Sequence, residues 1–100
     1  MYARVTTGHF QPGTIEALMP FFEEAAHQQQ GMQGFVSAQL LIDRTANTFM
    51  VVTVCATLAD LEASGTVPRK VLADPRVVAA LAGPPVIAVY EVAVQVAAHP

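Results

Sequence analysis

Two apolar runs joined by a polar segment occupy the middle of the chain. The runs, Phe35–Ile42 and Phe49–Ala56, flank the turn-forming segment Asp43–Thr48, a pattern typical of a β-hairpin with a longer loop. The second run is apolar on both faces of an extended strand. One face carries Phe49, Val51 and Cys55, and the other carries Met50, Val52, Val54 and Ala56. Such a strand has water on neither side, so the sequence predicts a sheet that is covered on both faces.

The N-terminal third predicts a strand followed by a helix. Tyr2–Phe10 is rich in β-branched residues, and Gln11-Pro12-Gly13 ends it. Within Thr14–Gln30, apolar residues recur at helical spacing: Ile15, Leu18, Met19, Phe22, Ala25 and Ala26. This spacing predicts an amphipathic helix, and Gly31 lies just beyond its end.

Short helical segments and a final strand follow the hairpin. Thr57 and Asp60 form a capping-box pattern before a helix over Leu58–Ser64, and a second helical piece is predicted for Pro68–Ala73. Asp74-Pro75 then resembles an N-cap followed by a first-turn proline, which begins a third helical piece. The β-branched composition of Val86–Val96 predicts the last strand.

The order of these elements defines the fold class. Strand, helix, strand, strand, broken helix, strand is the βαββαβ order of an α+β, ferredoxin-like sandwich with a four-stranded antiparallel sheet. We expect a single domain over residues 1–100, with the helices on one sheet face and the other face bare. Charged residues make up only 13% of the chain, about half of the usual share of roughly 25%. The bare face and the low charge together predict a homodimer.

Composition excludes several classes of partner. The net charge is −3, and the five Lys and Arg residues form no basic stripe, so we expect no binding to nucleic acid. The chain has no apolar run long enough to span a membrane, and its N-terminus lacks the apolar core of a signal peptide. The single cysteine, Cys55, agrees with a reducing compartment, and we expect a cytoplasmic protein.

Four stretches together resemble the antibiotic biosynthesis monooxygenase (ABM) family of dimeric α+β barrel proteins. The stretches are Gln11-Pro12-Gly13, Gly31–Phe35, Thr53–Ser64 and Gly83–Glu91, and their order and spacing carry the resemblance over nearly the whole chain. It implies a homodimer with its two sheets face to face, and a small cavity between sheet and helices. In active members that cavity holds a polyphenol, a quinol or haem, oxidised by molecular oxygen and often without a separate metal or flavin. We accordingly expect no cofactor.

The chain departs from that family at three functional positions. Active relatives carry a tryptophan at the end of the third strand, where this chain has Cys55, and the chain contains no tryptophan. Haem-degrading relatives use an asparagine on the first strand, where the offset from Gly13 places Thr6, and a histidine on the second helical segment, where Leu58–Leu81 has none. We therefore expect Thr6, Phe22 and Cys55 to line the ligand cavity, and the three departures disfavour haem degradation.

The sequence offers few other candidates for catalytic or binding residues. His9 is a candidate base at the cavity mouth or a solvated residue beside a turn, and Tyr90 is a candidate for binding a substrate oxygen or a buried hydrogen-bonding residue. Cys55 is a small buried hydrophobe or a reactive thiol. Arg4 is expected to pair with Glu91 across the first and last strands, in preference to forming an anion site. The histidines are too scattered for a metal site.

Two functions from different classes stay open. The first is a cofactor-independent monooxygenase that acts on a small aromatic ligand of the phenol or quinol type in an apolar cavity. The second is a non-catalytic homodimer of the same fold that binds a small ligand or has a structural role. With a thiol in place of an indole, the cavity is expected to be apolar and to take a neutral aromatic molecule.

Overall fold

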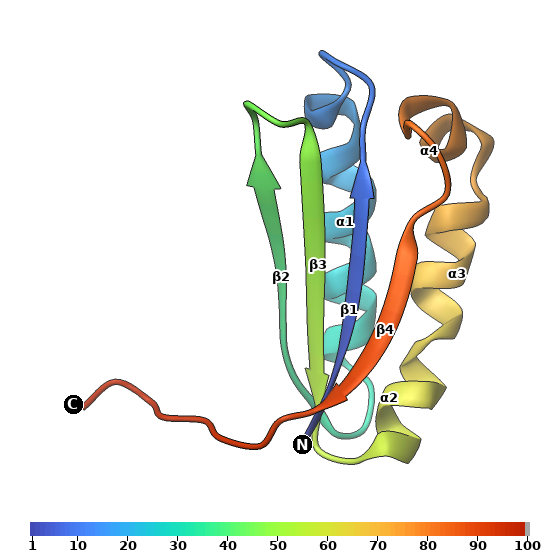
Figure 1. Ribbon diagram of the computed structural model, residues 1–100. Coiled ribbons are helices and arrows are strands. Elements are labelled where there is room, and N and C mark those ends of the chain that lie inside the picture. The colour runs from blue at the N-terminus through green and yellow to red at the C-terminus, as the bar shows by residue number, and fades with distance from the viewer. Residues whose placement is uncertain (100) are drawn as a thin grey trace.

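The computed structural model describes residues 1–99 and has one four-stranded antiparallel sheet with helices on one side (Figure 1). The strand order is β2-β3-β1-β4. The elements are β1 (Tyr2–His9), α1 (Ile15–Gln30), β2 (Phe35–Asp43), β3 (Thr48–Cys55), α2 (Leu58–Ser64), α3 (Thr66–Ala73), α4 (Pro75–Ala80) and β4 (Val86–Glu91). The predicted ferredoxin-like order is therefore confirmed.

Local capping explains where several of these elements begin. Thr57 Oγ1 accepts a hydrogen bond from the Asp60 backbone N–H at 3.1 Å, as the capping-box pattern predicts. Asp74 Oδ1 accepts one from the Arg76 N–H at 2.9 Å, and Pro75 occupies the first position of α4. Since both caps form between near neighbours in sequence, the sequence pattern was sufficient to predict them.

Two predicted boundaries change. The last strand ends at Glu91 rather than at Val96, because its partner β1 begins at Tyr2, which pairs with Glu91. The Val92 N–H still donates to the Met1 carbonyl oxygen at 2.9 Å, but β1 has no further residue that could continue the pairing. The helix predicted from Pro68 begins at Thr66, so the proline falls within the first turn, where its missing N–H costs no helical hydrogen bond.

The two faces of the sheet differ in burial, as the alternation in β3 predicts. Phe49 and Cys55 face the helices and are buried, whereas Met50 lies on the opposite face and is exposed. That opposite face, which we call the outer face, also carries exposed apolar side chains from both edge strands: Leu41, Val86 and Tyr90. The helices shown in Figure 1 leave it uncovered.

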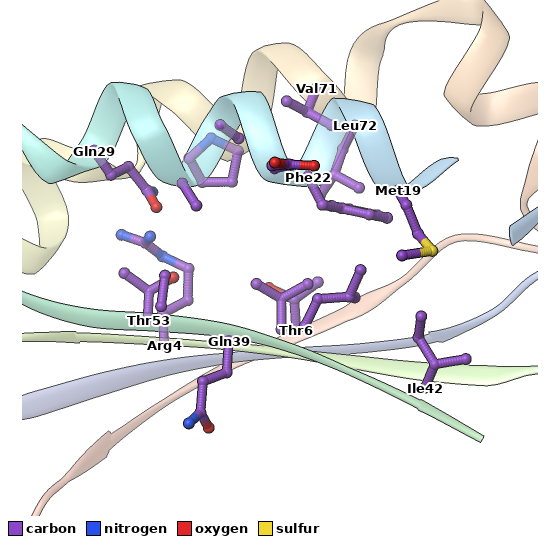
Figure 2. A pocket seen from close by; sticks show the side chains of 17 residues that line it. Arg4, Thr6, Met19, Phe22, Gln29, Gln39, Ile42, Thr53, Val71 and Leu72 are labelled. Carbon is purple, nitrogen blue, oxygen red and sulfur yellow. The ribbon is translucent and has the colours of Figure 1, made fainter. Parts of the chain in front are cut away.

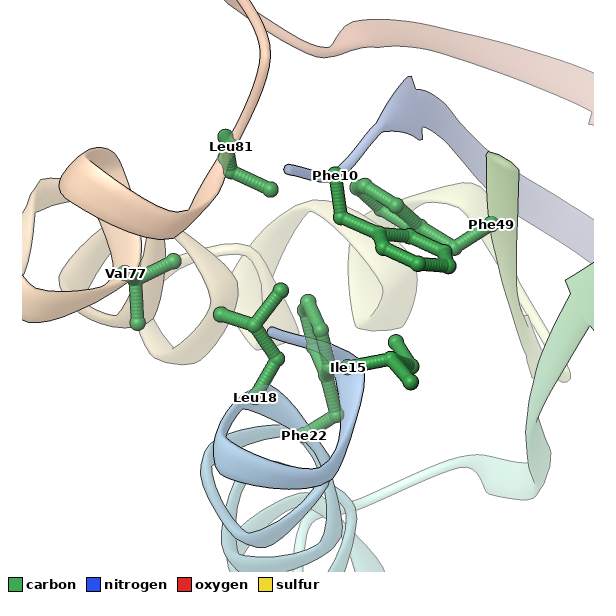
Figure 3. Close-up of a cluster of buried hydrophobic side chains, with 7 residues drawn as sticks. All are labelled: Phe10, Ile15, Leu18, Phe22, Phe49, Val77 and Leu81. Atoms are coloured by element: carbon green, nitrogen blue, oxygen red, sulfur yellow. The ribbon is translucent and has the colours of Figure 1, made fainter. Parts of the chain in front are cut away.

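An apolar cluster joins the sheet to the helices at one end of the molecule (Figure 3). Its members come from β3, from α1, from α4, and from the segments that follow β1 and α4: Phe10, Ile15, Leu18, Phe22, Phe49, Val77 and Leu81. The rings of Phe22 and Phe49 lie 5.5 Å apart between centroids. Gly8 makes room for this packing, because a Cβ atom there would lie 2.8 Å from the Phe49 ring. None of the helices within residues 1–99 is both long and apolar enough to span a membrane.

Candidate ligand-binding site

A cavity of about 290 Å³ lies between the helix-covered face of the sheet and helices α1 and α3 (Figure 2). Most of its wall is apolar, with side chains from both layers: Met19, Phe22, Leu40, Ile42, Val51, Val71 and Leu72. The exposed residue Glu23 on α1 also lines it and marks where it meets solvent, whereas the side chain of Gln39 on β2 points away from the cavity, to the outer face (Figure 2). The chamber is thus enclosed by the two layers and open along one side.

The polar side chains of the cavity gather at one end. Figure 2 shows Arg4, Gln29 and Thr53 close together there, while Met19 and Ile42 lie at the other end. Arg4 and Thr53 are neighbours on β1 and β3, in register across the sheet, and both face the helices. Gln29 faces them from the last turn of α1 and is only 3% exposed. The cavity therefore has a polar end and an apolar end.

Arg4 is the buried charge at the polar end. It is 7% exposed, and its Nη2 atom donates to the Leu61 carbonyl oxygen and to Ser64 Oγ, the latter at 3.1 Å. These acceptors belong to the last turn of α2, whose carbonyl end carries partial negative charge. Gln29 Nε2 donates to the Ser64 carbonyl oxygen at 3.4 Å, so α1 joins the same cluster.

The second terminal nitrogen of this guanidinium makes no hydrogen bond to the described residues. Among the described residues, the Nη1 atom of Arg4 is buried and has no hydrogen-bond partner. Burial lowers the pKa of Arg4, the Cys55 thiol acts in the opposite direction, and the guanidinium of Arg69 adds to the lowering. No carboxylate acts on it, so the positive charge is not neutralised by an ion pair within residues 1–99.

Comparison with known proteins identifies the fold. No protein-family model and no curated protein matches the sequence. Solved structures do match: a protein from Caulobacter crescentus CB15, provisionally named an antibiotic biosynthesis monooxygenase, is 22% identical with a TM-score of 0.76 over 94% of this chain and 90% of that chain. The chain has the fold of the antibiotic biosynthesis monooxygenases.

Two further ABM-fold structures cover almost the whole chain. Rv0793 from Mycobacterium tuberculosis is 13% identical, with a TM-score of 0.79 over 96% of this chain and 98% of that chain. An arginine-to-serine mutant of MhuD, whose structure holds two manganese protoporphyrin IX molecules per active site, is 20% identical, with a TM-score of 0.77 over 98% and 100% of the two chains. At such identities the likeness extends to the fold and not to individual side chains.

The residues expected at the cavity of this ABM fold separate into two groups. Thr6 and Phe22 lie in the cavity wall. Cys55 faces the same side of the sheet but is not part of the described wall; it is 1% exposed, at the end of β3 beyond Thr53. The thiol therefore packs in the interior next to the polar end of the cavity.

The candidate catalytic residues lie outside the cavity. Tyr90 is 58% exposed on the outer face, and His9 is exposed at the end of β1. His9 lines a separate hollow together with Thr7, Met50 and Val86. Within the described wall of the cavity, Arg4 and Glu23 are the charged side chains. Residues 1–99 contain no group of three or more His, Cys, Asp or Glu side chains arranged to hold a metal ion.

The expected pairing of Arg4 with Glu91 is wrong. Its neighbour across β1 and β4 is Val89, not Glu91, and its guanidinium reaches the helices instead of pairing with Glu91. The cavity wall is mostly apolar, as expected, but this buried guanidinium forms part of it. Gln29 was missed as well, although its spacing from Phe22 and Ala25 continues the buried stripe of α1 by seven and four residues.

Proposed function

We propose that this chain binds a small aromatic molecule of the phenol or quinol type in the cavity between its sheet and helices. The observation that carries the proposal is a largely apolar cavity between the two layers with a few converging polar groups at one end, which is the usual form of a small-molecule site. Its volume of about 290 Å³ lies at the small end of the roughly 300–1,000 Å³ typical of ligand pockets. One or two fused rings suit that size better than a macrocycle.

The first form of this function is a cofactor-independent monooxygenase. An electron-rich aromatic carbon would react with O2, gain one oxygen atom as a carbonyl group and lose two hydrogens. The second oxygen atom leaves as water, and the substrate itself supplies the four electrons. The protein would contribute an apolar chamber that excludes water and a cation that stabilises the anion of the substrate. The names of several ABM-fold neighbours support this reading.

The second form is a binding protein without catalysis. It is favoured by one observation: the described cavity wall contains no histidine, tyrosine or cysteine, and its one carboxylate, Glu23, belongs to an exposed side chain. A general base for phenol deprotonation would then have to be Glu23, the substrate or solvent. Measuring oxygen uptake separates the two forms.

Titration with 2-naphthol by calorimetry tests the proposal, followed by an oxygen-electrode assay with an electron-rich hydroquinone. We expect saturable binding of one molecule per chain. Val71→Trp, which places a large side chain in the cavity wall, should weaken binding, and Val78→Trp on the exposed face of α4 should not. Binding that is equally strong in both variants would place the site elsewhere, and binding without oxygen uptake would leave the non-catalytic form.

The outer face of the sheet is proposed as the homodimer interface. It carries exposed apolar side chains on central and edge strands, namely Leu41, Met50, Val86 and Tyr90. Contiguous apolar surface of this kind marks an interaction site in soluble proteins, and a face that meets its own copy fits two-fold symmetry. The ligand cavity lies on the opposite side of the sheet, so pairing would leave it accessible.

A further inference from the structure

The unpaired nitrogen of Arg4 sets a specific requirement on whatever fills the cavity. Arg4 is more than nine-tenths buried, its Nη2 atom is held by α2, and its Nη1 atom has no partner among residues 1–99. The side chain forms part of the cavity wall and stands beside Gln29 at the polar end (Figure 2). The position of the guanidinium is therefore fixed by the fold, while one of its donors is left unused.

Such an arrangement is costly unless a ligand completes it. A buried charge without an opposite charge is unfavourable, and so is a buried donor without an acceptor. The nearby charged side chain that acts on Arg4 is another cation, Arg69. Glu23 is the carboxylate of the cavity wall, and its exposed side chain lies 3.9 Å from His27, toward solvent. The polar end of the cavity consequently holds a guanidinium that no carboxylate of the described residues pairs with.

We propose that the cavity selects ligands carrying a single oxyanion, a carboxylate or an ionised phenol, and that Arg4 binds this group through Nη1. This deepens the proposed function of the same cavity, because it specifies the charge and the orientation of the aromatic ligand. The oxyanion lies at the polar end beside Gln29 and Thr53. The ring lies against Phe22 and extends toward Met19 at the apolar end.

Arginine suits this role for chemical reasons. Its guanidinium stays protonated over the whole physiological pH range, and hydrogen bonds between charged donors and carboxylates are stronger than those between neutral groups. The last turn of α2 holds the other nitrogen in place, so the guanidinium keeps its position at the polar end of the cavity. The neutral aromatic molecule expected from the sequence would leave this donor unsatisfied.

The test compares ligands of equal size and different charge on the unmodified protein. Calorimetric titrations use 2-naphthoate and its neutral counterpart 2-naphthylmethanol at neutral pH. We expect 2-naphthoate to bind at least about tenfold more tightly, as a hydrogen bond to a charged group implies. Titration of 2-naphthol below and above its own pKa distinguishes a phenolate preference from a carboxylate preference. Equal affinity of the anionic and neutral probes in every pair would overturn the proposal.

Three variants assign the effect to Arg4. Arg4→Gln should abolish the preference for the anion, whereas Arg4→Lys should retain part of the preference. Lys70→Gln removes the same charge from an exposed position on α3 outside the cavity wall and should keep the full preference. A preference that survives in folded Arg4→Gln contradicts the assignment to this residue.

The outcomes separate this inference from the function on which it rests. If 2-naphthylmethanol binds and 2-naphthoate binds no better, the cavity is a ligand site but Arg4 does not select an anion. If none of the probes binds the unmodified protein, the proposed function fails together with the inference. Circular dichroism of each variant shows whether it is folded. If Arg4→Gln does not fold, the comparison of ligands on the unmodified protein still decides whether the anion is preferred.

Discussion

The Nη2 atom of Arg4 lies 3.1 Å from the hydroxyl oxygen of Ser64, sixty positions later in the chain. The hydroxyl in turn donates to the Leu61 carbonyl oxygen at 2.7 Å, and Arg4 donates to that same oxygen. The three residues form a closed, buried set of hydrogen bonds between β1 and the last turn of α2. This set fixes the side chain that we assign to ligand binding.

Ser64→Ala tests the contribution of this set to stability. The substitution removes one acceptor of a buried guanidinium, so we expect the free energy of unfolding to fall by about 1–3 kcal/mol. Chemical denaturation followed by circular dichroism measures it. Ser37→Ala, at an exposed position on β2, is the matched control and should change stability by no more than about 0.5 kcal/mol. Equal unfolding midpoints for the two variants would show that the Ser64 hydroxyl contributes little.

Met50→Glu tests the proposed homodimer. Met50 lies on the outer face in the middle of the sheet, so a buried carboxylate at a symmetric interface should weaken association. Leu58→Glu is the control, since Leu58 is an equally apolar, exposed residue at the start of α2. Sedimentation should give a dimer for the unmodified chain and for Leu58→Glu, and a shift toward the 10.6 kDa monomer for Met50→Glu. A monomeric unmodified chain at micromolar concentration would contradict the proposal.

Titration with haemin tests the prediction that the chain does not bind haem tightly. We expect no stoichiometric shift of the Soret band, because the described cavity wall offers no histidine, cysteine or tyrosine to ligate iron, and the volume is small. Met19 is the wall residue with a sulfur that can ligate haem. A Soret shift that disappears in Met19→Leu would assign an unexpected ligand there, and one that disappears in His9→Ala would point to the hollow beside β1.

The fold was largely predictable because its signals are local. The alternation in β3, the helical spacing in α1 and the caps at Thr57 and Asp74 each depend on residues within a few positions of one another. The end of β4 was not predictable in this way. Its composition favours an extended strand through Val96, but the strand stops where β1 runs out of residues to pair.

The site was less predictable because it depends on contacts between distant segments. The environment of Arg4 comes from α2, 57 to 60 positions away, and sequence alternation alone gave only the face on which the side chain lies. The sequence favoured pairing of Arg4 with Glu91 because the first and last strands are neighbours in the predicted sheet. Gln29 is a polar residue at a helix end, where exposure is usual, and only its place in the i, i+4, i+7 series indicated burial.

The cavity lies between two fixed ends, and this limits the length of what it can hold. At one end, the bridge between Phe10 and Leu81 and the contact of Phe22 with Phe49 join the sheet to the helices. At the other end, Arg4 joins β1 to α2. Because both ends are held by these contacts, the cavity is already formed without a ligand, and its length does not change easily when one binds. The cavity therefore limits the length of its ligand: an anion on too short a body leaves a void at the apolar end, and one on too long a body must emerge on the open side beside Glu23.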